Sequence, residues 1–129
     1  GDVGAGNRAS SQDLVENVLK REPVIDVISG HNDAEVVGAY NAAVSQKRTN
    51  IKFIGIAGDK DVLSFISKGN PAWIGEVLQD PVVLGYQATD AMYRALKGEK
   101  LPETYNLPLP EAITPANIKN YNWQSWSWL

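Results

Sequence analysis

Three short apolar runs alternate with helical patterns along the chain, and this alternation strongly limits the possible folds. The runs lie at 24–29, 51–56 and 72–78, and each carries the β-branched residues that favour strands. A segment with helical spacing follows each run. Strands separated by such helices form βαβ units with a parallel sheet between two helical layers. We therefore predict an α/β fold with three layers (α/β/α) and a mostly parallel sheet.

Capping and stop signals place the expected helices. A capping-box pattern at 10–13 predicts a helix over about 8–20. Asp33 is expected to cap a second helix, and Asp59 opens a third. Pro81 suits the first turn of a long helix that reaches about residue 97.

The end of the chain gives weaker signals. The two prolines within 105–110 predict an extended segment at a sheet edge, and 114–115 begins a last short helix. Trp123, Trp126 and Trp128 fit neither one helical face nor one strand face, so we expect local packing or a disordered tail.

Composition excludes several classes of protein. The absence of cysteine excludes disulfides, thiolate zinc sites and cysteine nucleophiles. A net charge of −3 without a basic stripe argues against a nucleic-acid partner. No apolar run approaches the roughly 20 residues of a membrane span, and residues 1–13 lack the features of a targeting segment. We expect one domain, the mature part of a larger product.

Catalytic motifs are absent from the sequence, so we expect no enzyme and no cofactor. His31 is the single histidine, and no HExxH, GxSxG or P-loop pattern occurs. Asp59 and Asp61 could form a magnesium pocket, but acids that complement a helix dipole explain them better, and we expect no metal site.

Polar residues lie where the expected strands end. Ligands of parallel sheets bind beyond the carboxyl ends of the strands, which here selects the loops 29–33, 57–60 and 79–81. Asn32 and Gln79 can donate hydrogen bonds to hydroxyl groups and accept them, as polyol recognition requires. Asp33 and Asp80 are expected to cap helices instead. The candidate ligand-binding residues are Asn32, Gln79, Asp59 and His31, although a structural role explains His31 equally well.

An ordered set of short motifs resembles the ribose-type periplasmic binding proteins. Residues 23–28, then Gly30-His31-Asn32-Asp33 and Val37-Gly38-Ala39, resemble one signature of that family. Further similar segments follow in order at 54–58, 68–69, 76–81, Gly85 and 95–100. The resemblance covers nearly the whole chain.

The resemblance implies a two-lobed clamp of the type I periplasmic-binding-protein fold that closes on a sugar and delivers it to an ABC importer. Residues 1–129 then form the C-terminal lobe region, and 81–104 pack on a first lobe that is not in the chain. The implied partners are a sugar or polyol and the membrane subunits of an ABC transporter. The implied location is periplasmic or extracellular, cell-surface lipoproteins included.

Helix 82–97 keeps an apolar face, so we expect this face to be buried against another protein surface. The helix would fold back on its own lobe, exchange with a second copy, or bind a separately produced first lobe.

Two positions depart from the family pattern. An aromatic ring is replaced by Gly6 and a sugar-binding aspartate by Ala57, so we expect weak or no ribose binding. Two alternative functions stay open: the effector-binding domain of a LacI-type repressor, and a periplasmic subunit that presents its ligand to a sensor kinase.

Overall fold

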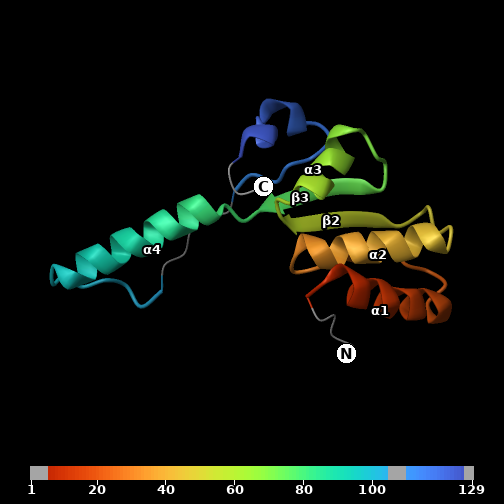
Figure 1. The fold of residues 1–129 in the computed structure, drawn as a ribbon, viewed down its shortest axis with the longest axis horizontal. Coiled ribbons are helices and arrows are strands. Elements are labelled where there is room, and N and C mark those ends of the chain that lie inside the picture. Colours follow the sequence, from red (N-terminus) through yellow and green to blue (C-terminus); the bar gives the residue numbers. More distant parts are fainter. Residues whose placement is uncertain (1–5, 105–109, 127–129) are drawn as a thin grey trace.

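Three parallel strands form the centre of the structure, a computed structural model that describes residues 6–104 and 110–126 (Figure 1). They are β1 (Val27–Ser29), β2 (Lys52–Ala57) and β3 (Trp73–Leu78), in the order β1-β2-β3. Both strand pairs are parallel, with Ile28 opposite Phe53 in one and Ile56 opposite Val77 in the other. The predicted α/β class with a parallel sheet is confirmed.

Helices cover both faces of this sheet. Helix α2 (Asp33–Ser45) packs on β2, and α1 (Arg8–Arg21) packs on α2. Helix α3 (Lys60–Ser67) packs on β3 from the opposite side (Figure 1). These layers arise because each helix buries one apolar face, as α3 does with Val62, Leu63 and Ile66.

Two element starts differ from the expectation. Helix α1 is capped by Asn7, whose side chain accepts a hydrogen bond of 3.0 Å from the Ser10 amide, rather than by Ser10 itself. The run 24–29 pairs only from Val27 onward, because β2 begins at Lys52 and offers no earlier partner. Val24 is 75% exposed as a result.

An aromatic cluster fills the core near the start of β3. Trp73 is fully buried, and its ring stacks on Phe65 with 5.2 Å between the ring centroids. Tyr40 contacts the rings of both residues and of Phe53. Trp73 is therefore a core residue at the end of the sheet opposite the expected ligand edge.

The chain after α4 returns to the edge of β3. Ile113 forms an antiparallel bridge with Glu76, and two short 3-10 helices follow at Ile118–Asn120 and Trp123–Ser125. Trp123 is buried, so the packing interpretation holds for this tryptophan, and Trp126 lies against Tyr121. Trp128 and most of the predicted edge segment 105–110 lie outside the described residues.

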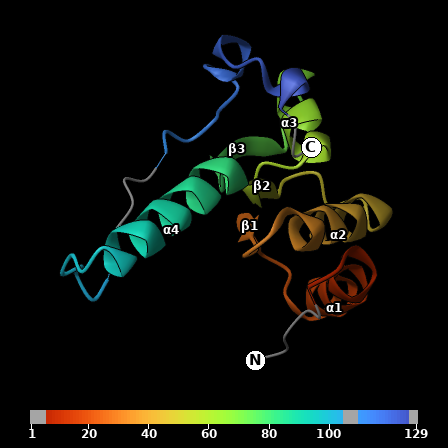
Figure 2. The same ribbon diagram turned by 60° about the vertical axis from the view of Figure 1, so that its left-hand side comes forward.

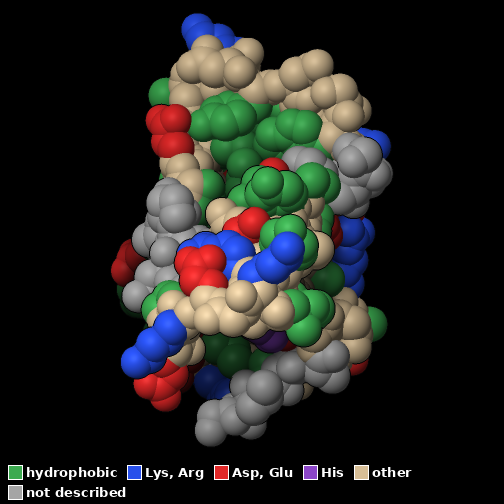
Figure 3. All heavy atoms as spheres, turned by 90° about the vertical axis from the view of Figure 1, so that its left-hand side faces the viewer, with side chains coloured by type: hydrophobic (Ala, Val, Ile, Leu, Met, Phe, Trp, Pro, Cys, Tyr) green, Lys and Arg blue, Asp and Glu red, His purple; other side chains and the backbone are tan. Residues whose placement is uncertain are grey.

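Helix α4 (Pro81–Leu96) extends away from the sheet in both ribbon views (Figures 1 and 2). None of its residues is buried, and Leu84 and Met92 are 45% and 65% exposed. Of the three expected ways to cover this helix, the structure does not show the first, folding back on its own lobe, because the faces of the sheet are already covered by α2 and α3. The other two stay predictions. Figure 3 views the molecule from the side to which α4 projects and shows hydrophobic side chains among charged ones there.

Within the described ranges, no helix combines the length and the apolar character that crossing a membrane requires.

Candidate functional site

The carboxyl ends of the three strands bring the predicted loops to one edge of the sheet. The backbone amide of Gln79, just after β3, donates a hydrogen bond of 3.0 Å to the Ala57 carbonyl at the end of β2. The Asp59 amide donates one of 2.6 Å to Asp33 Oδ2 at the start of α2. These contacts join the ends of β2 and β3 to the first turn of α2, so the sequence-predicted residues share one edge. We call it the ligand edge.

Asn32, and not Asp33 as predicted, caps helix α2. Asn32 is the N-cap of α2, and its Oδ1 accepts a hydrogen bond of 2.9 Å from the Glu35 amide. Asp33 does not cap the helix. It is buried, and its carboxylate accepts hydrogen bonds from backbone amides at the end of β2 instead. The reason is geometric, because Asn32 has the extended backbone of a cap whereas Asp33 is already the first helical residue. The Asn32 Nδ2 donates to no described residue, so it is available to a ligand.

Gln79 and Asp80 differ in how they are held. Asp80 caps α4 as predicted, accepting hydrogen bonds from the Val82 and Val83 amides at 2.9 and 3.1 Å. Gln79 is exposed, and its side chain forms no hydrogen bond to a described residue. Only its backbone is fixed, through Ala57. The side-chain amide of Gln79 is therefore exposed to solvent at the ligand edge.

His31 and Asp59 lie on the outer part of this edge. The His31 side chain is 78% exposed, and its Nδ1 lies 2.7 Å from Glu35 Oε2. Asp59 stands at the N-cap of α3 without a side-chain capping hydrogen bond. Asp61, its companion in the magnesium hypothesis, forms an ion pair with Arg8 instead. That these residues contact a ligand in a cleft stays a prediction.

A pair of buried carboxyl groups lies directly beneath the ligand edge. Asp33 is 1% exposed, and its oxygens accept hydrogen bonds from the Ile56 amide at 2.8 Å and the Gly58 amide at 3.0 Å. Glu76 of β3 is fully buried, and its Oε1 accepts one of 2.9 Å from the Ala57 amide. We call Asp33 and Glu76 the carboxyl pair.

Burial sets the protonation of this pair. Loss of water, together with the neighbouring Asp33 charge, raises the pKa of Glu76 to about 9. Burial also raises the pKa of Asp33, although hydrogen bonds from the Asp59, Gly58 and Ile56 amides oppose the rise.

Gly55 leaves the room that this pair occupies. A Cβ atom at Gly55 would lie 1.9 Å from Glu76 Oε2 and 2.5 Å from Asp33 Oδ1, distances that exclude any side chain there. Sequence reasoning missed Glu76, although one acidic residue inside the apolar strand WIGEVL was the available signal.

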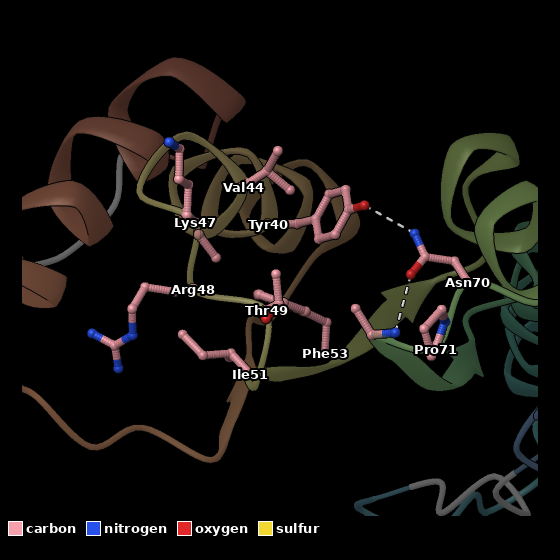
Figure 4. A pocket seen from close by; sticks show the side chains of 11 residues that line it. Tyr40, Val44, Lys47, Arg48, Thr49, Ile51, Phe53, Asn70 and Pro71 are labelled. Carbon is pink, nitrogen blue, oxygen red and sulfur yellow. Dashed lines mark hydrogen bonds between the residues drawn. The ribbon is translucent and has the colours of Figure 1, made fainter.

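A pocket of about 300 Å³ lies at the opposite, amino end of the sheet (Figure 4). Its walls come from α2, the loop after it and the loop before β3, and Figure 4 shows Tyr40, Val44 and Phe53 among the lining side chains. Asn70 lines the pocket, and its Nδ2 donates a hydrogen bond of 2.9 Å to the Tyr40 hydroxyl. None of the predicted site residues lines this pocket, and its lining is mostly apolar.

Comparison with known proteins agrees with this architecture. Residues 1–100 match the family described as periplasmic binding protein domain. Over 103 residues the chain is 32% identical to the ribose import binding protein RbsB of Bacillus subtilis; the match covers 80% of the chain and 33% of that protein. The chain thus spans about one third of the curated relatives it matches.

Two solved structures share the fold. One is a periplasmic solute binding protein of an ABC transporter from Actinobacillus succinogenes with bound D-allose, at a TM-score of 0.79 and 18% identity, covering 92% of this chain and 41% of that one. The other is an ABC transporter solute binding protein from Agrobacterium vitis with bound allitol, at 0.77 and 27%, covering 92% and 42%. Because the family match extends over residues 1–100, this chain belongs to the periplasmic binding protein domain family.

Proposed function

We propose that this chain is one lobe of a solute-binding protein that captures a sugar or polyol at the ligand edge for an ABC importer. The observation that carries the proposal is the pair of side-chain amides at that edge. The side-chain nitrogens of Asn32 and Gln79 donate no hydrogen bond to described residues. The backbone of each residue is fixed by a hydrogen bond. Amides with unused donors suit hydroxyl groups, and at Asn32 the cap contact of Oδ1 also lowers the ordering cost of binding.

The proposed ligand is a polyhydroxy compound other than ribose. The Bacillus subtilis relative is named for ribose and the Agrobacterium vitis structure holds allitol, so relatives of this chain take both a pentose and a hexitol. Gly6 offers no ring for stacking and Ala57 no carboxylate for paired hydroxyl groups. We expect a ligand that relies on the amide contacts more than on those two.

The exposed face of α4 supports a second lobe as the other half of the site. Leu84, Met92 and Tyr93 are each at least 45% exposed along that helix. Residues 81–104 would pack on that lobe, and the ligand would bind between the two, with closure favoured by the contacts that only the closed state makes. The family match supports a location of the working protein in the periplasm or outside the cell.

The test is calorimetry on a polypeptide that carries both lobes, with ribose, D-allose and allitol as probes. We expect binding of at least one probe other than ribose. At 100 times the dissociation constant that probe adds about 2.7 kcal/mol to the free energy of unfolding.

Matched variants identify the site. Gln79→Ala is expected to weaken binding at least tenfold, since its side-chain amide is proposed to face the ligand. The exposed Lys68→Ala at the far end of α3 is expected to leave the affinity unchanged. Tight ribose binding would show that other residues replace the missing ring and carboxylate. Equal affinity in Gln79→Ala and the unmodified protein would place the ligand elsewhere.

A further inference from the structure

The carboxyl pair holds three consecutive amides of the turn between β2 and α3. Glu76 Oε1 accepts from the Ala57 amide at 2.9 Å, and Asp33 Oδ2 accepts from the Gly58 and Asp59 amides at 3.0 and 2.6 Å. Ala57 has a φ of 150°, a value that few residues with a side chain adopt. We call residues 57–59 the anchored turn. It forms the middle of the ligand edge, and its backbone position depends on the carboxyl pair.

One oxygen of the pair lacks a donor. Glu76 Oε2 is buried and accepts no hydrogen bond from an N–H or O–H group of the described residues. It lies beside Gly55 next to Asp33 Oδ1: a Cβ at Gly55 would be 1.9 Å from the first oxygen and 2.5 Å from the second, so the two oxygens are neighbours. A hydrogen bond between two carboxyl groups requires a proton on one of them.

The charges around the pair favour this proton. Helix α2 contributes Asp33 and strand β3 contributes Glu76, while the anchored turn adds the exposed Asp59, whose charge acts on Asp33. Strand β2 faces the pair with Gly55 and backbone amides, and the segment opposite β3 with the backbone of Ile113. None of the charges that act on the pair is positive. Two adjacent buried carboxylates without a cation would repel each other strongly.

The two groups are not equivalent. Asp33 accepts three backbone hydrogen bonds, from Ile56, Gly58 and Asp59, which stabilise its charged form. We propose that Glu76 is protonated at neutral pH and donates its Oε2 proton to Asp33 Oδ1, and that this shared proton holds the anchored turn at the ligand edge. When Glu76 loses this proton to solvent base, the second negative charge drives the two side chains apart and the turn is released.

Glu76 is thus a positioning residue for the ligand edge. It lies beneath the turn and acts through Ala57, which itself stands at the end of β2. The expected effect on ligand affinity rests on the proposed function, whereas the shared proton and its effect on the turn do not.

The direct test is a carbon-13 NMR titration of the glutamate carboxyl groups in the chain. We expect one glutamate to titrate near pH 9 and its resonance to be missing in Glu76→Gln. The exposed Glu103→Gln is the matched control and retains it. A Glu76 resonance that titrates near pH 4.5 would overturn the proposal, and this outcome needs no variant to fold.

Amide exchange of residues 57–59 tests the consequence for the turn. Glutamine keeps a neutral donor toward Asp33 and an acceptor for the Ala57 amide, so Glu76→Gln is expected to exchange within about threefold of the unmodified chain at pH 7. Glu76→Ala removes both groups and is expected to raise exchange at least about tenfold. Above pH 9 the unmodified chain is expected to lose protection, measured relative to the base-catalysed exchange of an unprotected amide, while Glu76→Gln keeps it. An equal loss of protection in Glu76→Gln would contradict the shared proton.

A probe titration on the two-lobed protein separates this inference from the proposed function. Loss of affinity above pH 9, abolished in Glu76→Gln, supports both. Absence of sugar binding at every pH contradicts only the proposed function, because the glutamate titration does not depend on it.

Discussion

Asn32 Oδ1 accepts a hydrogen bond of 2.9 Å from the Glu35 amide, so a residue proposed to bind ligand also begins helix α2. The two roles use different atoms of one side chain: the oxygen caps the helix, and the nitrogen is the atom proposed to bind the ligand. Substitutions at this position therefore separate stability from binding.

Asn32→Asp is expected to keep the stability and lose affinity. Aspartate caps helices as well as asparagine does, and its charge suits the helix N-terminus, but it cannot donate a hydrogen bond. Asn32→Ala loses both functions and is expected to cost about 1 kcal/mol of unfolding free energy. Denaturant titration and calorimetry of both variants check this. Unchanged affinity in Asn32→Asp would show that the nitrogen does not reach the ligand.

Gly55→Ala is expected to destabilise the chain by about 2 kcal/mol or more, because the new methyl group would lie 1.9 Å from Glu76 Oε2. Gly85→Ala is the matched control. Gly85 lies within α4 with nothing within 4 Å of an added Cβ, so alanine there is expected to be neutral or slightly stabilising. Equal stabilities for the two variants in denaturant titration would contradict the close contact at Gly55.

The dependence of stability on pH follows from Glu76. Its pKa is about 9 in the folded chain against 4.5 for the ordinary group, so the folded state binds the extra proton between these values. The free energy of unfolding is therefore expected to fall as the pH rises from 4.5 to 9 and to level off above that range.

Glu76→Gln removes this titration. Its stability relative to the unmodified chain is expected to grow steadily from pH 6 to pH 9, as measured by denaturant titration at each pH. A difference that stays constant over this range would show that Glu76 is already ionised in the folded chain at pH 6.

Trp73→Phe is expected to cost less than Trp73→Ala. The Trp73 Nε1 is buried and donates to no described residue, so phenylalanine loses volume but no hydrogen bond. Alanine leaves a cavity beside Phe65 and is expected to cost about 3–5 kcal/mol. Thermal unfolding of both variants measures the difference, and equal losses would show that the aromatic ring at this position adds nothing to stability.

Met92→Glu is expected to leave the stability of the lobe within about 0.5 kcal/mol, because Met92 is 65% exposed on α4. The same change is expected to weaken association with a first lobe, or with a second copy, because the helix then places a charge on its apolar face. Light scattering of the chain, alone and with a first lobe supplied separately, measures this. Particles that stay single-chain under both conditions would contradict a covered helix face.

Much of the fold follows from local patterns in the sequence. The alternation of β-branched runs with helical spacing predicts β2, β3 and the helices between them, because each pattern reports which side of an element is buried. Helix α1 and the Asp80 cap are predicted for the same local reasons.

The interior of the site depends on contacts between distant residues. Asp33 looks like a cap because it directly precedes an apolar helical face, yet its carboxylate is held by amides 23 to 26 residues away. Glu76 is an acid in a strand, and only the neighbouring Gly55 and Asp33 show why it is tolerated there. The apolar face of α4 predicts that the helix is covered, but periodicity alone does not identify what covers it.

The short connection between β3 and α4 gives the helix the mechanics of a lever. The Gln79 backbone is fixed to Ala57, and the Asp80 side chain is fixed to the first turn of α4, so the peptide between them is the pivot. Sixteen helical residues extend from it, about 24 Å at the rise of an α-helix, so a rotation of about 10° at the pivot moves the far end by about 4 Å. Gln79 lies at this pivot, where a small change in backbone angle becomes a larger displacement at the far end of the helix.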